Sequence, residues 1–161
     1  TYAPTSLKEF FYNCTSLETI SGLEYLNTAN ITDMSSMFYG CSNLTSLNLT
    51  KFDTKNVSSM YFMFYGCSNL TSLNLTNFNT KNVKGMNGMF GDCTHLTSLD
   101  ITNFNTAKVT NMGNMLPWLL QSHLARPHKL QHSEGDGICT VCSKVAPLSP
   151  RSISQTSTQR R

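Results

Sequence analysis

The last third of the chain holds the cysteines and histidines whose spacing most resembles a chemical site. Cys139 and Cys142 form a C-x-x-C pair, and His123, His128 and His132 precede it. Thiolate and imidazole groups are the ligands of tetrahedral zinc sites, and C-x-x-C is a common half of such a site. One such pair with one H-x-x-x-H spacing is a weak signal, so a zinc-binding tail is only a minor alternative. We expect no metal and no other cofactor.

Basic residues gather in the same tail, at Arg151, Arg160 and Arg161. After residue 115 the chain has six basic and two acidic residues, whereas residues 1–115 have six basic and seven acidic ones. A basic cluster could contact nucleic-acid phosphates. The excess charge is confined to the tail, whose sequence is better explained by a shifted reading frame. We therefore expect no nucleic-acid partner.

Sulfur-containing side chains are the other candidates for chemistry, since eight methionines could suggest a copper site and six cysteines a disulfide framework. All eight methionines fall on two positions of a 26-residue period, which favours packing in a core. Four cysteines also occur once per unit, which favours a buried ladder of free thiols. These residues are Met34, Met60, Met86, Met112, Met37, Met63, Met89, Met115, Cys14, Cys41, Cys67 and Cys93.

The best candidate for ligand binding is a set of polar residues that alternates with leucines in three successive units. Their hydroxyl, amide and carboxylate groups would make a nearly uncharged surface suited to extended contact with a protein or a glycan. An alternative is that these side chains only hydrogen-bond to one another along the array. Residues 1–115 assemble no nucleophile, general base and oxyanion site, so we expect no enzyme. The nine residues, called the polar face below, are Ser46, Asn48, Thr50, Ser72, Asn74, Thr76, Ser98, Asp100 and Thr102.

The elements that would position the polar face follow from one 26-residue unit. Residues 44–49 follow L-x-x-L-x-L, which predicts a short strand whose leucines point inward. Residues 57–64 carry apolar side chains at helical spacing, and Gly66 follows where a left-handed backbone suits glycine. The sequence therefore predicts a repeat solenoid of about four coils, each with one short strand plus one short helical turn.

The repeats divide the chain into an array over 1–115 and a tail over 116–161. The first unit of the array is degenerate, because Phe11 and Cys14 stand 27 rather than 26 residues ahead of their equivalents. Solenoids need terminal units with a polar outer face, and none is evident here. We therefore expect self-association at uncapped solenoid ends.

The unit F-Y-G-C-S-N-L-T-S-L-N-L-T-N-F-N-T-K-N-V-x-x-M-x-x-M, which is almost intact from Phe38 and from Phe64, resembles the 26-residue repeat of the bacterial surface protein family. These are the BspA-like leucine-rich repeats, and the resemblance covers residues 7–115. It implies a leucine-rich-repeat-like solenoid in a cell-surface or secreted protein. It also implies adhesion or protein binding, with no catalytic residues to carry over. The first unit departs from the pattern at residues 20–30.

A shifted reading frame explains the tail better than a zinc site does. The codons of residues 116–136, reread one base downstream, permit F-H-G-C-S and then S-L-T-S-L-D-L-T-N-F-N-T-A-K-V-T. The implied cysteine falls at the codon of Leu119, which is 26 residues after Cys93. A further step of one base from Gly137 permits another unit. We interpret the tail as a frameshifted continuation of two more repeats, which as translated should be largely irregular.

The leading hypothesis is a non-enzymatic repeat module of a surface or secreted protein, which binds a host or cell-surface protein or glycan through the polar face. Its location at the cell surface or outside the cell is inferred from the family resemblance only. The alternative is an intracellular structural scaffold, which predicts no export signal in the complete gene. We find no signal peptide and expect no membrane span in the sequence shown.

Overall fold

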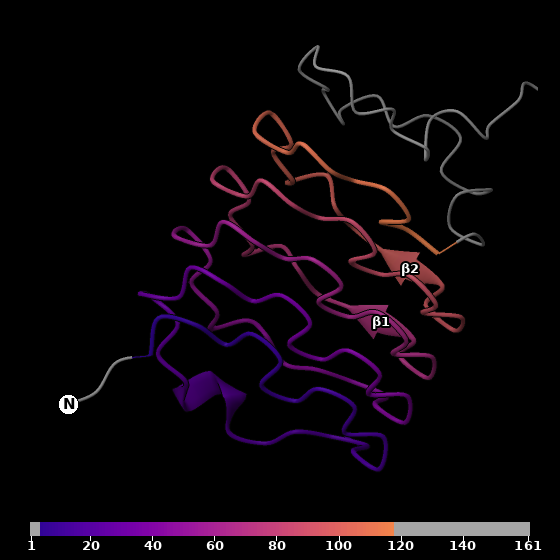
Figure 1. Cartoon of the computed structure of the whole chain (residues 1–161). Helices are drawn as coiled ribbons and strands as arrows, with labels where there is room; N and C mark the ends of the chain where they lie inside the picture. Colours follow the sequence, from indigo (N-terminus) through magenta and orange to yellow (C-terminus); the bar gives the residue numbers. More distant parts are fainter. Residues whose placement is uncertain (1–3, 118–161) are drawn as a thin grey trace, which may run out of the picture.

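Residues 4–117 are described by the computed structural model, and they wind into successive coils that lie one beside the next (Figure 1). Parallel backbone bridges join equivalent residues of neighbouring coils: Asp33 to Ser59, Ser59 to Gly85, and Gly85 to Asn111. Each pair of partners is 26 residues apart, so the period of the sequence is also the step of the stack in space. We propose on this basis that the chain is a repeat solenoid.

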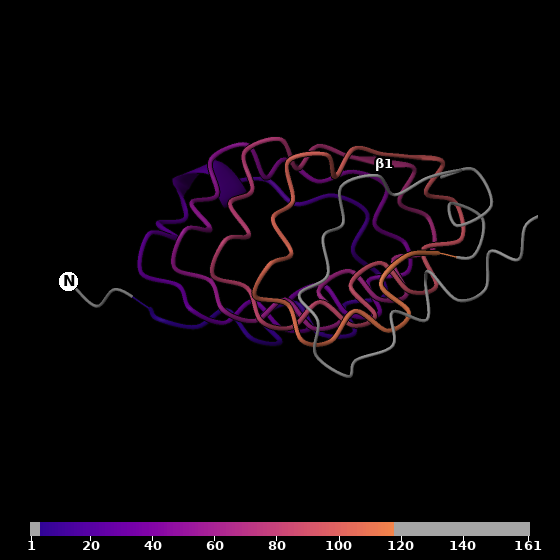
Figure 2. The same ribbon diagram turned by 90° about the horizontal axis from the view of Figure 1, so that it is seen from above.

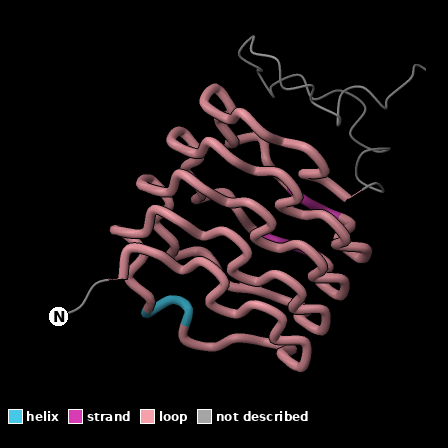
Figure 3. The backbone as a smooth tube through the Cα atoms, in the orientation of Figure 1, coloured by secondary structure: helices cyan, strands magenta, loops and turns pink. Residues whose placement is uncertain are grey.

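Regular secondary structure is sparse in the described residues, most of which form loops and turns (Figure 3). Strands β1 (Ser72–Leu73) and β2 (Ser98–Leu99) pair in parallel, with Ser72 opposite Ser98 and Leu73 opposite Leu99. One 3-10 helix, η1 (Leu23–Tyr25), follows Gly22. The strand predicted over 44–49 is not assigned in the structure, although its equivalents one and two units later contain β1 and β2.

Tight turns replace the short helix that the sequence predicts at 57–64. The N–H of Phe62 donates to the carbonyl oxygen of Asn87 in the next coil at 3.0 Å, whereas the N–H of Met63 donates to that of Met60 in its own coil at 3.4 Å. Alternate amides along the segment repeat this pattern. An α-helix needs successive amides for bonds within the segment, so hydrogen bonding between coils excludes it. We call the three turn segments 33–40, 59–66 and 85–92 the turn wall.

The core consists of columns of identical side chains, one from each coil. The rings of Phe38, Phe64 and Phe90 are fully buried, with centroids 5.6 and 5.5 Å apart and planes within 6° of parallel. In the unit from Leu44 every residue predicted to point inward is buried except Leu47, which is partly buried. The buried set of that unit is Leu44, Leu49, Phe52, Val57, Met60, Met63, Phe64 and Cys67.

The first coil accommodates its extra residue between Phe11 and Thr28. The thiol of Cys41 donates to the carbonyl oxygen of Phe11, 30 residues back, whereas the equivalent thiols of the next two coils reach 29 residues back. Beyond this interval the register is regular, because the N–H of Asp53 donates to Thr28 Oγ1, 25 residues back, as in later coils. Helix η1 lies within this interval.

Each coil is a flattened loop when seen from above, and β1 lies along one of its long sides (Figure 2). Leu116 and Pro117, the first two residues of the predicted tail, are buried. The rest of that tail, with all five candidate zinc ligands and the three arginines, lies outside the described residues. The division at 115 and the shifted reading frame therefore stay predictions.

Candidate ligand-binding face

All nine residues of the polar face are exposed to solvent. The pairing of β1 with β2 places Ser72 directly opposite Ser98, and the 26-residue step brings the remaining residues into rows of equivalents. Leu73, which lies between Ser72 and Asn74, is only 7% exposed. Successive side chains of extended backbone point to opposite sides, so the leucines anchor the face while the polar residues project from it.

The amide residues of the face bond within their own coil. Asn48 Oδ1 accepts the N–H of Thr50 at 3.2 Å and its hydroxyl at 2.7 Å. Asn74 Oδ1 accepts the same two groups of Thr76 at 3.1 and 2.8 Å. This arrangement is an Asx turn, in which a side-chain oxygen takes the place of a backbone carbonyl. Each turn fixes the amide and hydroxyl in the same orientation from coil to coil.

Asp100 replaces the asparagine in the third row and is the only charged residue of the face. Its carboxylate accepts the N–H and the hydroxyl of Thr102 at 2.9 and 2.7 Å. These hydrogen bonds favour the ionised form and so hold the pKa of Asp100 below its usual value. The bond from the backbone N–H of Thr102 has the larger effect. The polar face therefore carries a single negative charge at neutral pH.

Within the described part of the chain, no side chain of the polar face hydrogen-bonds to another coil. The alternative of a ladder running along these nine residues is therefore not what the structure shows. The Oδ1 atoms of Asn48, Asn74 and Asp100 accept hydrogen bonds only from their own coil. The NH₂ groups of Asn48 and Asn74 and the hydroxyls of the three serines make no hydrogen bond there. These groups can donate to the acceptor oxygens of a ligand.

The ladder between coils comes instead from a column of buried threonines, which the sequence reasoning missed. Thr54 Oγ1 accepts the N–H of Asn79 at 2.8 Å and donates to the carbonyl oxygen of the same residue at 3.2 Å. Thr80 makes the same pair of bonds to Asn105 at 2.7 and 3.0 Å. The available signal was a threonine two residues after each of Phe52, Phe78 and Phe104. The column consists of Thr28, Thr54, Thr80 and Thr106, all at most 4% exposed.

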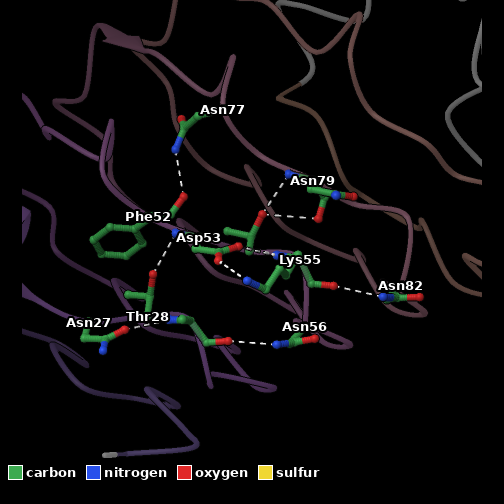
Figure 4. A network of polar contacts seen from close by, with 11 residues as sticks. Asn27, Thr28, Phe52, Asp53, Lys55, Asn56, Asn77, Asn79 and Asn82 are labelled. Atoms are coloured by element: carbon green, nitrogen blue, oxygen red, sulfur yellow. Dashed lines mark hydrogen bonds and ion pairs between the residues drawn. The ribbon is translucent and has the colours of Figure 1, made fainter.

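Asparagine side chains add further bonds between coils. Asn77 Nδ2 donates to the carbonyl oxygen of Phe52 at 2.8 Å, and Asn82 Nδ2 donates to that of Lys55 at 2.9 Å (Figure 4). An exposed ion pair joins Lys55 Nζ to Asp53 at 2.8 Å, and the hydrogen bonds from Lys55 hold the pKa of Asp53 below its usual value. These residues support the backbone beside the threonine column, so they are structural rather than free to bind a ligand.

The family model described as "Mycoplasma protein of unknown function, DUF285" matches residues 5–122. The chain belongs to the DUF285 family. That match covers the whole described array, including the polar face and the threonine column. No curated protein and no solved structure gave a match.

Three of the four periodic cysteines of the DUF285 chain are buried free thiols, as the sequence predicts, but Cys14 is exposed. Cys14 lies in the first coil, and no earlier coil of the described residues covers it. Burial raises the pKa of Cys41 to about 11 and that of Cys93 to about 12, and it raises the pKa of Cys67 further. A buried neutral thiol is a poor nucleophile, so these three side chains serve packing.

The DUF285 array offers no cluster of three or more metal-ligating side chains among residues 4–117. His95 Nδ1 lies 2.6 Å from the carbonyl oxygen of Ser68 in the previous coil, so the imidazole is held by the frame. The zinc ligands suggested by the tail fall outside the described residues. Over the same residues we find no helix with the length and apolar character needed to cross a bilayer.

Proposed function

We propose that the DUF285 chain is a non-enzymatic repeat module of a surface or secreted protein, which binds a protein or glycan through the polar face. The observation that carries this proposal is the repetition of the Asx turns. Three successive coils repeat the same Asx turn, with asparagine in two coils and aspartate in the third, and a row of buried or partly buried leucines supports them. A regular row of preorganised donors suits an extended ligand, because little side-chain entropy is lost on binding.

The resemblance to BspA-like repeats supports the surface location and the adhesive role. The DUF285 family is itself of unknown function, so the finer assignment to the 26-residue bacterial surface repeat belongs to this proposal. The second candidate is an intracellular scaffold. An intracellular scaffold would have the same fold as the surface module. The two candidates differ in the export signal, which the complete gene of a scaffold would lack.

The test uses substitutions that block the face without disturbing its turns. Ser46 and Ser72 are exposed, and their hydroxyls make no hydrogen bond within residues 4–117, so S46K/S72K adds bulk and charge while the Asx turns stay intact. The matched control is A107K, which introduces the same side chain at an exposed residue outside the face. The labelled full chain is incubated with cultured animal cells and bound fluorescence is measured by flow cytometry.

The proposal predicts saturable binding by the parent chain and by A107K, and at least a tenfold loss with S46K/S72K. Pretreatment of the cells with protease or with glycosidases shows which class of ligand is bound. Absence of saturable binding by the parent chain, or equal binding by all three proteins, would contradict the proposal.

A further inference from the structure

Aromatic side chains gather on the turn wall, away from the nine residues of the polar face in each coil. Tyr39 and Tyr65 stack with centroids 5.1 Å apart and planes within 10°. Phe62 stands nearly perpendicular to both, at 6.4 Å from the first and 5.7 Å from the second. All three rings and that of Tyr61 are half-buried. We call the three rings that contact one another, Tyr39, Phe62 and Tyr65, the aromatic ledge.

The next coil is shaped to receive these rings. Gly85, Gly88 and Gly91 lie beneath Tyr61, Phe62 and Tyr65 respectively, and a Cβ at any of the three would collide with the ring above it. The equivalent residues of the preceding coil are a serine and two of the ledge aromatics themselves. The rings therefore lie against bare backbone on the buried side and keep their remaining surface towards solvent.

Phe62 holds a backbone conformation that its residue type disfavours. Its φ is +54°, in the left-handed region, where a bulky aromatic is an outlier. The equivalent residues of neighbouring coils are Ser36 and Gly88, and both share this conformation with positive φ. Glycine would occupy it with less strain. A strained aromatic with a partly exposed ring is the kind of feature that a stability requirement alone does not explain.

The surroundings of the ledge define the chemistry of a ligand. The turn wall has no lysine or arginine, and its charged residues are Asp33 and Asp92. The Asp92 carboxylate beside the Tyr65 hydroxyl raises the pKa of that tyrosine to about 12. An anionic ligand is therefore disfavoured. The backbone N–H groups of alternate residues are used between coils, as with Gly40 N–H to Tyr65 O at 2.7 Å, so an added peptide strand would find few free partners.

We propose that the aromatic ledge is a binding site for neutral oligosaccharides. The ring surface of Phe62 would contact the apolar C–H face of a pyranose, while the hydroxyls of Tyr39 and Tyr65 and the carboxylate of Asp92 would bond its hydroxyl groups. This inference rests on the proposed function only in assuming an external ligand, because it uses a different surface from the polar face.

The test is saturation-transfer NMR of the full chain with cellotetraose, maltotetraose and chitotetraose, followed by titration of the sugar that binds. F62G removes the ring and also relieves the left-handed strain, so binding should fall about tenfold or more while the melting temperature stays unchanged or rises. S36G is the matched control, because it relieves the same strain one coil earlier without removing a ring. It should bind as the parent chain does.

Two results would overturn the ledge proposal. They are no binding of any of the three tetrasaccharides, or unchanged binding by F62G, whatever the melting temperature of that variant. S46K/S72K separates this proposal from the previous one, since it should keep full affinity for the tetrasaccharide. Loss of cell binding by S46K/S72K with retained sugar binding would leave both proposals standing. Retained cell binding with loss of sugar binding would contradict both proposals. Unchanged sugar binding by F62G would remove only the ledge.

Discussion

The turn wall and the polar face are built from the same repeat but use their hydrogen bonds in opposite ways. On the turn wall, backbone groups bond from coil to coil, as with Phe64 N–H to Met89 O at 2.9 Å. On the polar face, the side-chain bonds close within one coil, as with Thr50 to Asn48. The wall shares the cohesion of the stack with the threonine column and the backbone pairing of β1 with β2. The side chains of the face, in contrast, can meet a ligand without breaking a side-chain contact between coils.

The largest expected effect is on the buried phenylalanine column behind the turn wall. F64A removes a fully buried ring that stacks on Phe38 and Phe90, so we expect a loss of about 3–5 kcal/mol in the free energy of unfolding. L47A, on the partly buried side of the strand segment, should cost about 1 kcal/mol. Urea unfolding followed by circular dichroism measures both. Equal losses would mean that the two sides contribute equally to the cohesion of the stack.

The threonine column gives the next largest effect. T54V keeps the shape of the side chain but leaves the N–H of Asn79 without its partner, so we expect a loss of about 1–3 kcal/mol. T54S keeps the hydroxyl and should retain most of the stability. T50V, on the exposed face, should change the free energy of unfolding by less than about 0.5 kcal/mol. A cost for T50V as large as that for T54V, measured by the same urea unfolding, would refute the division between frame and face.

The buried thiols give a smaller effect that depends on pH. The pKa of Cys41 is raised from 9.0 to about 11, so the folded chain keeps this thiol protonated where the unfolded chain would ionise it. The stability contributed by protonation is complete below about pH 9 and is lost as the pH rises towards 11. Thermal melts between pH 7 and 11 should therefore show a decreasing midpoint, and C41A should reduce the slope. A midpoint that increases over this range would contradict the assignment.

Much of the frame is visible in the sequence because periodic apolar residues report burial directly. The 26-residue step and the buried phenylalanine, methionine and cysteine positions follow from spacing alone. The left-handed backbone predicted at Gly66 is also confirmed, with φ of +72°. The helix predicted at 57–64 from the spacing of apolar residues was wrong. In this segment every second amide bonds to the next coil, and the apolar side chains of such a turn segment can also point inward.

The features of the candidate sites were harder to predict. Each coil has a second left-handed position, which is Ser36 and Phe62 in two coils and a glycine, Gly88, in the next. The positions of the glycines in the sequence therefore did not reveal it. The threonine column resembles ordinary turn residues until its partners in the next coil are known. The exposure of the polar face follows from alternation with leucine, but its Asx turns depend on distances that spacing does not contain.

The central claim is that backbone hydrogen bonds between coils hold the turn wall, while donor groups of the polar face stay free for a ligand. Residue-resolved hydrogen exchange of the full chain, measured by NMR, tests this claim. We expect the amides of Phe62 and Phe64, which donate between coils, to exchange only through global unfolding. The side-chain NH₂ groups of Asn48 and Asn74 should exchange orders of magnitude faster. Slow exchange at those NH₂ groups, or fast exchange at the two wall amides, would refute the division between a hydrogen-bonded turn wall and a polar face that is free to bind.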